Sequence, residues 1–189
     1  LRAQAFLRYG KLLATVPFWI ALDLYSRRFF NEVFYRQYRG MRKDWLAAKA
    51  EELFETEVLP KIYPGAQASL RGDRQQGFRL VLLSGGLDFA LLPAVRYFGF
   101  DDLICNRLVY QDGVATGEVA SPLLAEQEKV AAVHRFCREY NVETARSKAY
   151  SDSFSDLPML EAVGLPSAVN PDRRLRRAAS DRGWPVVNL

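Results

Sequence analysis

Residues 78–98 read FRLVLLSGGLDFALLPAVRYF, and this stretch decides the fold class. Its apolar beginning, residues 78–83, predicts a short β-strand, Ser84-Gly85-Gly86 predicts a turn, and residues 87–98 have the amphipathic pattern of a helix. A strand followed by a tight turn and a helix is half of a β-α-β unit. The stretch therefore favours a parallel sheet.

The same alternation continues toward the C-terminus. Short strands are predicted at residues 147–150, 167–169 and 185–189, and helices at residues 126–140, 157–163 and 171–182. Residues 107–119 predict a β-hairpin about Asp112-Gly113, a strong turn signal. We expect an α/β fold with a Rossmann-like parallel sheet and helices on both faces.

Residues 1–60 have a different character, because they contain only two glycines and carry aromatic side chains at helical spacing. They predict an α-helical unit. The most apolar part, residues 12–24 (LLATVPFWIALDL), is shorter than the roughly 18 residues that span a bilayer and contains Pro17 and Asp23. It predicts a buried or interfacial helix, and no signal peptide pattern precedes it.

Composition narrows the chemistry. The chain has 189 residues, of which 49% are hydrophobic, and this content excludes global disorder. Cys105 and Cys137 are too few for a disulfide framework and suit free thiols in a reducing compartment, so we expect a cytoplasmic protein. His134 is the single histidine, which excludes zinc sites built from several histidines. Carboxylates, hydroxyls and lysine are the expected reactive groups.

The net charge is +4, and much of the excess comes from arginines near the C-terminus. A solvated helix surface explains them better than nucleic-acid binding, because no aromatic residues are interleaved with them. The arginines are Arg173, Arg174, Arg176, Arg177 and Arg182.

Two strand ends carry candidate site residues, since ligands of parallel sheets bind beyond the carboxyl ends of strands. At Ser84-Gly85-Gly86, a hydroxyl and close backbone N–H groups suit a phosphate oxygen, although an ordinary turn is an alternative. After the strand at residues 147–150, Asp152 and Asp156 suit a Mg²⁺ ion, although the same residues could begin the next helix. Lys129 could neutralise a phosphate in the same crevice or lie on the surface.

The order of these motifs resembles that of the haloacid dehalogenase superfamily, and more closely its phosphoserine phosphatase-like branch. Residues 150–186 (YSDSFSDLPMLEAVGLPSAVNPDRRLRRAASDRGWPV) resemble the fourth motif and C-terminal run of that branch. The resemblance covers residues 60–189 well, whereas residues 1–60 fit the cap of the branch in position and character. In chain order, the motifs are Ser84-Gly85-Gly86, Asn106-Arg107-Leu108, Asp112-Gly113, Thr116-Gly117, Lys129, Asp152 and Asp156.

The resemblance implies a Mg²⁺-dependent phosphatase that hydrolyses phosphomonoesters of a small metabolite through an aspartyl-phosphate. It implies that Ser84 and the Gly85 N–H bind the phosphoryl group and that Lys129 stabilises its charge. It further implies that Asp152 ligates Mg²⁺ and that Asp156 supports the metal shell.

The resemblance also implies two domains, a helical cap over residues 1–62 and a haloacid dehalogenase-like α/β core over residues 63–189. A cap of this kind excludes water and selects the leaving group. Arg36 and Arg39 are the candidates to reach an anionic group of the substrate, with surface arginines as the alternative. A lipid phosphomonoester is an alternative substrate, because residues 12–24 with Arg27 and Arg28 suit peripheral contact with a membrane.

The sequence departs from the family pattern at three points. Ser151 stands where glycine usually precedes the first Asp of motif IV, and Ser155 stands where phosphoserine phosphatases carry asparagine. The DxDxT motif, which supplies the nucleophile, is not found in residues 1–189. We expect it upstream of residue 1. The alternative is a catalytically inactive phosphate-binding or interaction module of the same fold.

Overall fold

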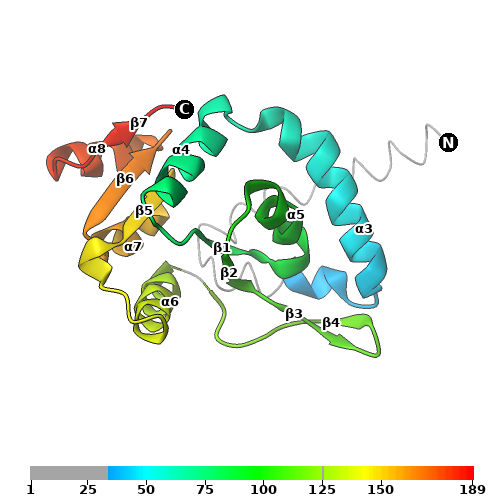
Figure 1. Ribbon diagram of the computed structural model, residues 1–189. Coiled ribbons are helices and arrows are strands. Elements are labelled where there is room, and N and C mark those ends of the chain that lie inside the picture. The colour runs from blue at the N-terminus through cyan, green and yellow to red at the C-terminus, as the bar shows by residue number, and fades with distance from the viewer. Residues whose placement is uncertain (1–33, 125) are drawn as a thin grey trace.

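The computed structural model describes residues 34–124 and 126–189, and its strands form three small sheets (Figure 1). Strands β1 (Val81–Leu87) and β2 (Asp102–Asn106) pair in parallel, and β3 (Leu108–Gln111) and β4 (Val114–Val119) form an antiparallel hairpin. Strands β5 (Lys148–Ser151), β6 (Leu165–Val169) and β7 (Val186–Val187) form a parallel sheet in that order. The predicted α/β fold with parallel sheets is confirmed.

Helices precede, connect and cover these strands (Figure 1). The helical elements, with their bounds, are η1 (Arg36–Tyr38), α3 (Lys43–Leu53), the π-helical η2 (Phe54–Val58), η3 (Leu59–Lys61), α4 (Pro64–Gln75), α5 (Asp88–Phe98), α6 (Glu126–Glu139), η4 (Thr144–Arg146), η5 (Phe154–Asp156), α7 (Leu157–Glu161) and α8 (Arg173–Asp181). In the part of the chain that the structure describes, none of these helices is long and apolar enough to cross a membrane. The apolar residues 12–24 lie outside the described residues.

The first predicted strand and turn are shifted in the structure. Strand β1 begins at Val81 rather than at residue 78, because the Phe78 N–H still bonds to the carbonyl of Asp73 in α4. The strand also continues through Ser84-Gly85-Gly86, which was predicted as a turn, and Leu87 pairs with Asn106. The pairing register shifts between Ser84 and Leu87, so this segment is an irregular end of β1.

The hairpin at residues 108–119 is confirmed, with the positive φ angles at Asp112 and Gly113 that such a turn requires. It also contacts the start of α3 and the residues before it, since the Lys43 N–H bonds to the Gly113 carbonyl at 2.8 Å and the Ala115 N–H to the Met41 carbonyl at 2.8 Å. The hairpin therefore joins the helical unit by backbone hydrogen bonds, which the sequence pattern did not predict.

Two hydrophobic clusters stabilise the fold. The first combines Tyr35 and Leu46 of the helical unit with residues of β1, β3 and β4, and the second lies among α7, α8 and β6. Leu160 and Leu175 in the second cluster are fully buried. Burial of each such side chain contributes about 1.5–3 kcal/mol to the free energy of folding. Because the first cluster contains side chains from both sides of residue 62, the division into a cap and a core stays a prediction.

Strands β1 and β5 border the same core. Leu83 of β1 and Ala149 of β5 both pack against the second hydrophobic cluster. Among the described residues, β1 pairs only with β2 and β5 only with β6, so each strand has one unpaired edge. Apart from Leu87, the residues of β1 are only half-buried, whereas central strands of parallel sheets are normally buried on both faces.

Candidate active site

The phosphate-binding candidate at the end of β1, Ser84-Gly85-Gly86, is held by hydrogen bonds to its backbone N–H and carbonyl groups. The Gly86 N–H donates to Ser84 Oγ at 3.1 Å, and this contact leaves the proton of the Ser84 hydroxyl free to be donated to a ligand. The Gly85 carbonyl accepts from the Tyr35 hydroxyl at 2.7 Å and from Asn106 Nδ2 at 2.8 Å. A Cβ at Gly85 would lie 3.2 Å from the Leu124 carbonyl oxygen, so only glycine fits without a shift.

The second candidate group lies after β5, where Lys129 of α6 reaches Asp156. Lys129 Nζ lies 2.5 Å from Asp156 Oδ1, and both side chains are only 15% exposed. The Ser151 hydroxyl donates to Asp156 Oδ2 at 2.8 Å. The structure therefore brings Lys129 and Asp156 together and commits both carboxylate oxygens of Asp156 to protein donors, while their roles in a reaction stay predictions.

Asp152 differs from Asp156, because its side chain is exposed at the carboxyl end of β5. Within the described residues, the structure assigns no hydrogen bond or ion pair to the Asp152 carboxylate, and no group of three or more His, Cys, Asp or Glu side chains gathers there. Mg²⁺ prefers one or two carboxylates together with water and substrate phosphate oxygens. An uncommitted carboxylate at this strand end fits one ligand of such an ion.

Asp172 connects this loop to α8 and was not singled out by the sequence analysis. Its N–H donates to the Asp152 carbonyl at 2.7 Å, its Oδ2 accepts from the Phe154 N–H at 2.7 Å, and its Oδ1 accepts from the Leu175 N–H at 2.8 Å. Burial would raise the pKa of Asp172, but the N–H groups of Leu175 and Phe154 lower it below its ordinary value. Its position directly before α8 is the signal of a helix N-cap.

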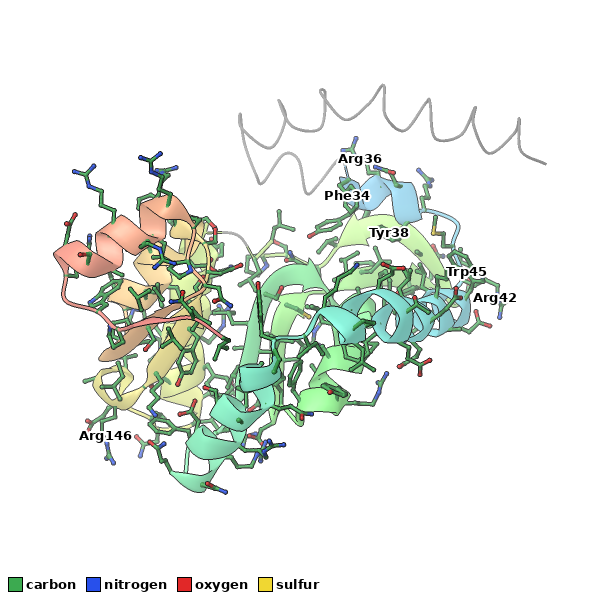
Figure 2. The ribbon with its side chains drawn as sticks, turned by 90° about the horizontal axis from the view of Figure 1, so that it is seen from above. Phe34, Arg36, Tyr38, Arg42, Trp45 and Arg146 are labelled. Carbon is green, nitrogen blue, oxygen red and sulfur yellow. The ribbon has the colours of Figure 1, made fainter. Side chains whose placement is uncertain are left out.

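Arg36 and Arg39, the predicted substrate contacts, lie beside β4. Both side chains are exposed, and Figure 2 shows Arg36 pointing away from the strands. Gly117, with φ 81°, packs against both residues, since a Cβ there would lie 3.0 Å from Arg39 Cβ and 3.2 Å from Arg36 Cα. A role in substrate binding stays a prediction for both arginines.

The arginines of α8 and Arg182, which follows that helix, are all exposed, in keeping with a solvated helix surface. Arg182 pairs with Glu161 at 2.6 Å, and Arg177 lies 4.0 Å from Asp181. Arg174 differs from these arginines because it makes a cation–π contact with the Asp152–Asp156 loop. Its guanidinium lies 4.0 Å from the ring centre of Phe154 in that loop.

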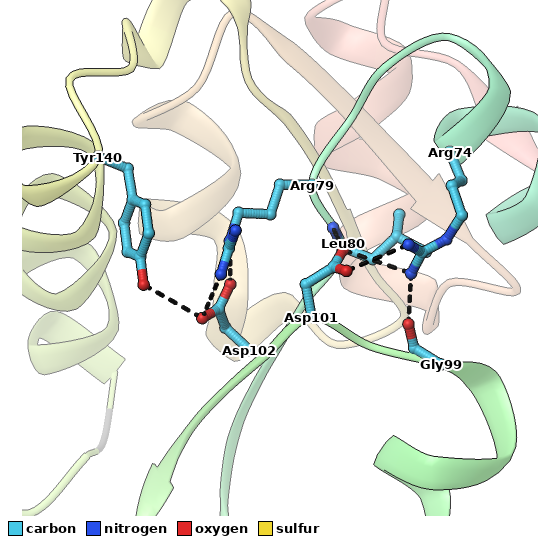
Figure 3. Close-up of polar contacts among 7 residues, drawn as sticks. All are labelled: Arg74, Arg79, Leu80, Gly99, Asp101, Asp102 and Tyr140. Carbon is cyan, nitrogen blue, oxygen red and sulfur yellow. Dashed lines mark hydrogen bonds and ion pairs between the residues drawn. The ribbon is translucent and has the colours of Figure 1, made fainter.

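The opposite end of β1 and β2 carries a group of ion pairs (Figure 3). Asp101 accepts from the Leu80 N–H at 2.8 Å and from Arg74 at 3.1 Å, and Asp102 pairs with Arg79. These contacts lie where β1 and β2 begin, whereas Ser84 lies further along β1. They tie α4 to the sheet rather than forming part of the candidate site.

The family model described as haloacid dehalogenase-like hydrolase matches residues 2–161. The chain belongs to this family. The resemblance stated from the motifs is thereby confirmed.

Named relatives agree with this family. A probable phosphatase of Mycobacterium tuberculosis is 37% identical over 132 residues, which are 70% of this chain and 46% of that protein. The chain thus spans about half the length of this relative. A histidinol-phosphatase of Neisseria meningitidis is 29% identical over 182 residues, covering 84% of this chain and 82% of that protein.

Solved structures show the same fold. A protein of unknown function from Bordetella pertussis has a TM-score of 0.83 and 29% identity, covering 98% of this chain and 82% of that chain. A probable phosphoserine phosphatase from Vibrio cholerae has a TM-score of 0.66 at 18% identity, covering 85% of this chain and 46% of that chain. The second likeness concerns the fold alone.

Proposed function

We propose that the protein containing this chain is a Mg²⁺-dependent phosphomonoester hydrolase that acts on a small phosphorylated metabolite through an aspartyl-phosphate. The observation that carries the proposal is the partly buried Lys129–Asp156 pair at 2.5 Å, on the loop that also carries the exposed Asp152 four residues earlier. Phosphoryl transfer depends mainly on positioning and on neutralisation of charge, and this loop offers a fixed cation and a candidate metal ligand.

Each candidate site residue has a defined task in this proposal. The Ser84 hydroxyl and the Gly85 N–H bind phosphoryl oxygens at the end of β1. The Lys129 ammonium neutralises the phosphoryl group and orients the attacking carboxylate, while Asp156 keeps that ammonium in place. Because both oxygens of Asp156 already accept hydrogen bonds, we assign direct metal ligation to Asp152 rather than to Asp156.

A Mg²⁺ ion held by Asp152 would supply further neutralisation of the phosphate charge. The loop geometry supports this assignment, because two backbone contacts to Asp172 fix the chain on both sides of Ser153. The Asp152 side chain is therefore presented from an anchored backbone.

The nucleophile is proposed to come from a strand upstream of residue 1 that inserts between β1 and β5. Both strands border the same core, and each has one unpaired edge among the described residues. A parallel strand between them would emerge between the irregular end of β1 at Ser84 and the Asp152 loop, where a carboxylate would face the phosphoryl group. Such a strand would also cover the half-buried residues of β1.

The cellular location and the selection of substrate are parts of the same proposal. Cys105 and Cys137 are free thiols, in keeping with a reducing, cytoplasmic environment. We assign substrate selection to the cap over residues 1–62, with Arg36 and Arg39 as contacts to an anionic group.

The full-length protein tests the proposal with Mg²⁺ and para-nitrophenyl phosphate, followed by a phosphate-release screen over phosphorylated metabolites and lipid phosphomonoesters. Turnover is expected, and Asp152→Asn or Lys129→Met should lower kcat by roughly 10²-fold or more. Arg177→Ala, on the exposed face of α8, is the matched control and should leave kcat unchanged. Phosphate binding without turnover would instead identify an inactive phosphate-binding module.

A further inference from the structure

Asn106 is a buried polar residue to which neither the family resemblance nor the proposed mechanism gives a task. It ends β2, is 2% exposed, and borders the cluster that contains Leu87 and Leu108. An amide in such a place costs free energy unless its donors and its acceptor are paired. Here they are paired, and every partner is a group near the candidate site.

The amide nitrogen of Asn106 replaces a missing part of the strand ladder. Between Ser84 and Leu87 the β1–β2 register shifts, so Gly85 has no paired residue in β2. Asn106 Nδ2 donates instead to the Gly85 carbonyl at 2.8 Å, and the Tyr35 hydroxyl donates to the same oxygen at 2.7 Å. Asn106 Nδ2 also lies 3.3 Å from the Tyr35 hydroxyl, so the three groups form one network.

These contacts set the orientation of one peptide plane. The carbonyl of Gly85 and the N–H of Gly86 belong to the same planar peptide group. The carbonyl is held by Asn106 and Tyr35, while the N–H donates to Ser84 Oγ at 3.1 Å. A rotation of this plane would break the hydrogen bond from the Gly86 N–H to Ser84 Oγ, which fixes the Ser84 hydroxyl beside the strand end.

The other side of the same amide faces the segment that leads into α6. Asn106 Oδ1 accepts from the Leu124 N–H at 2.7 Å, and Nδ2 lies 3.4 Å from the Leu124 carbonyl. Leu124 is buried and stands five residues before Lys129. One side chain thus contacts both the end of β1 that would bind phosphate and the entry to the helix that carries Lys129.

We propose that Asn106, assisted by Tyr35, is a positioning residue that orients the Gly85–Gly86 peptide for phosphate binding and holds this end of β1 against the segment that leads to the Lys129 helix. The inference rests on the proposed function, because the end of β1 has a phosphate to bind only if the protein is a phosphatase. Tyr35, which stands before α3 in the helical unit, adds a direct link from that unit to the same carbonyl.

Three variants of the full-length protein test this inference. Asn106→Asp keeps the size of the side chain but replaces the donor by an acceptor that faces the Gly85 carbonyl. Asn106→Ala removes both functions, and Tyr35→Phe removes only the second donor and preserves the ring. Asp101→Asn is the matched control, because it changes a hydrogen-bonded acid at the opposite end of the same pair of strands.

The measurements are kcat and KM for para-nitrophenyl phosphate, the Kd of inorganic phosphate, the melting temperature, and hydrogen exchange of the Gly86 and Leu124 amides. Asn106→Asp and Asn106→Ala should lower kcat/KM by about 10- to 100-fold and weaken phosphate binding, with faster exchange at both amides. Tyr35→Phe should lower kcat/KM by about 3- to 10-fold, since the hydrogen bond from Asn106 remains. Asp101→Asn should lower the melting temperature but keep kcat/KM within about twofold.

Two results would overturn the inference in distinguishable ways. A wild-type protein that neither turns over the substrate nor binds phosphate contradicts the proposed function and the inference together. An active wild type whose Asn106→Asp and Tyr35→Phe variants change kcat/KM and phosphate binding no more than Asp101→Asn does contradicts the inference alone. Should Asn106→Ala fail to fold, Tyr35→Phe still decides, because it leaves the packing of the cluster intact.

Discussion

The Ser151 hydroxyl donates a hydrogen bond to Oδ2 of Asp156 at 2.8 Å, while the Lys129 ammonium lies 2.5 Å from Oδ1 of the same carboxylate. The glycine that usually stands at position 151 in this family has no side chain to do this. Ser151 Oγ also accepts from the Ser153 N–H at 3.2 Å. A departure from the family pattern therefore adds a contact that fixes the acid on which Lys129 depends.

Replacing Ser151 by alanine should lower kcat while leaving KM nearly unchanged. The substitution removes one hydrogen bond to a buried charge and keeps the Lys129–Asp156 contact, so a loss of about 3- to 30-fold in kcat is expected. Ser151→Thr retains the hydroxyl and should keep most of the activity. Equal kcat values for wild type and Ser151→Ala would show that Lys129 alone holds the carboxylate.

Asp172 should control the affinity for Mg²⁺ without touching the ion. Asp172→Asn replaces one carboxylate oxygen by an NH₂ group, which cannot accept from both the Phe154 and the Leu175 N–H. Groups that orient metal ligands typically contribute 10- to 100-fold to metal affinity, so the Mg²⁺ concentration for half-maximal activity should rise by about tenfold or more. Asp181→Asn on the same helix is the control. A Mg²⁺ dependence that matches wild type would argue against the assignment.

The repetitive parts of the fold could be predicted from local pattern. The hairpin about Asp112-Gly113 was predicted because its turn needs residues that tolerate positive φ, and these are rare enough to be informative. The alternation of strands and helices gave the α/β class for the same local reason. Strand β2 (Asp102–Asn106) was missed, because its five residues carry two polar ends around a short apolar centre.

Only those residues of the candidate site that belong to a sequence motif could be predicted. Lys129 and Asp156 are 27 residues apart, and the family resemblance made each of them a candidate without predicting the contact between them. Asn106 and Tyr35 are 71 residues apart and meet only through the tertiary fold. Asp172 stands 18 residues after Phe154, so a local pattern shows it only as a helix cap. Long-range hydrogen bonds of this kind leave no periodic trace in a sequence.

Asp101 should make the stability of the protein depend on acid pH. The Leu80 N–H and Arg74 lower the pKa of Asp101 against the opposing effect of burial. A carboxyl group whose pKa is lower in the folded state stabilises the fold above its unfolded pKa, and this contribution is lost as the pH falls through the folded pKa. Asp101→Asn should therefore be less stable than wild type by about 1–2 kcal/mol at pH 7.

The difference between Asp101→Asn and wild type should shrink as the pH falls below about 4, near the ordinary pKa of an aspartate. Urea unfolding at pH 7, 5 and 3 measures it. Asp181→Asn removes an exposed pair at 4.0 Å and should change stability little at any of these values. A gap between Asp101→Asn and wild type that stays constant from pH 7 to pH 3 would contradict the assigned role.

Gly164 should be the least replaceable glycine of the sheet that carries the Asp152 loop. A Cβ at this position would lie 1.8 Å from the Ala145 carbonyl oxygen, a distance that no side chain tolerates. The backbone cannot easily move away, because the Gly164 N–H bonds to the Thr144 carbonyl and the Leu165 N–H to the Ser147 carbonyl, each at 3.0 Å. These two bonds align the start of β6 with β5.

Gly164→Ala should therefore lower the free energy of unfolding by more than about 3 kcal/mol. For a chain of this size, a loss of that amount lowers the melting temperature by roughly 6–12 °C. Gly72→Ala is the matched control, since Gly72 lies within α4 and a Cβ there would meet no atom within 4 Å. That variant should be more stable than wild type by about 0.5–1 kcal/mol, because alanine favours the helix. Because Gly164 aligns β6 with the strand that ends at Asp152, Gly164→Ala should also lower kcat in the protein that remains folded, whereas Gly72→Ala should not. Similar melting temperatures for the two variants would mean that the loop at residues 144–147 moves to accept the methyl group.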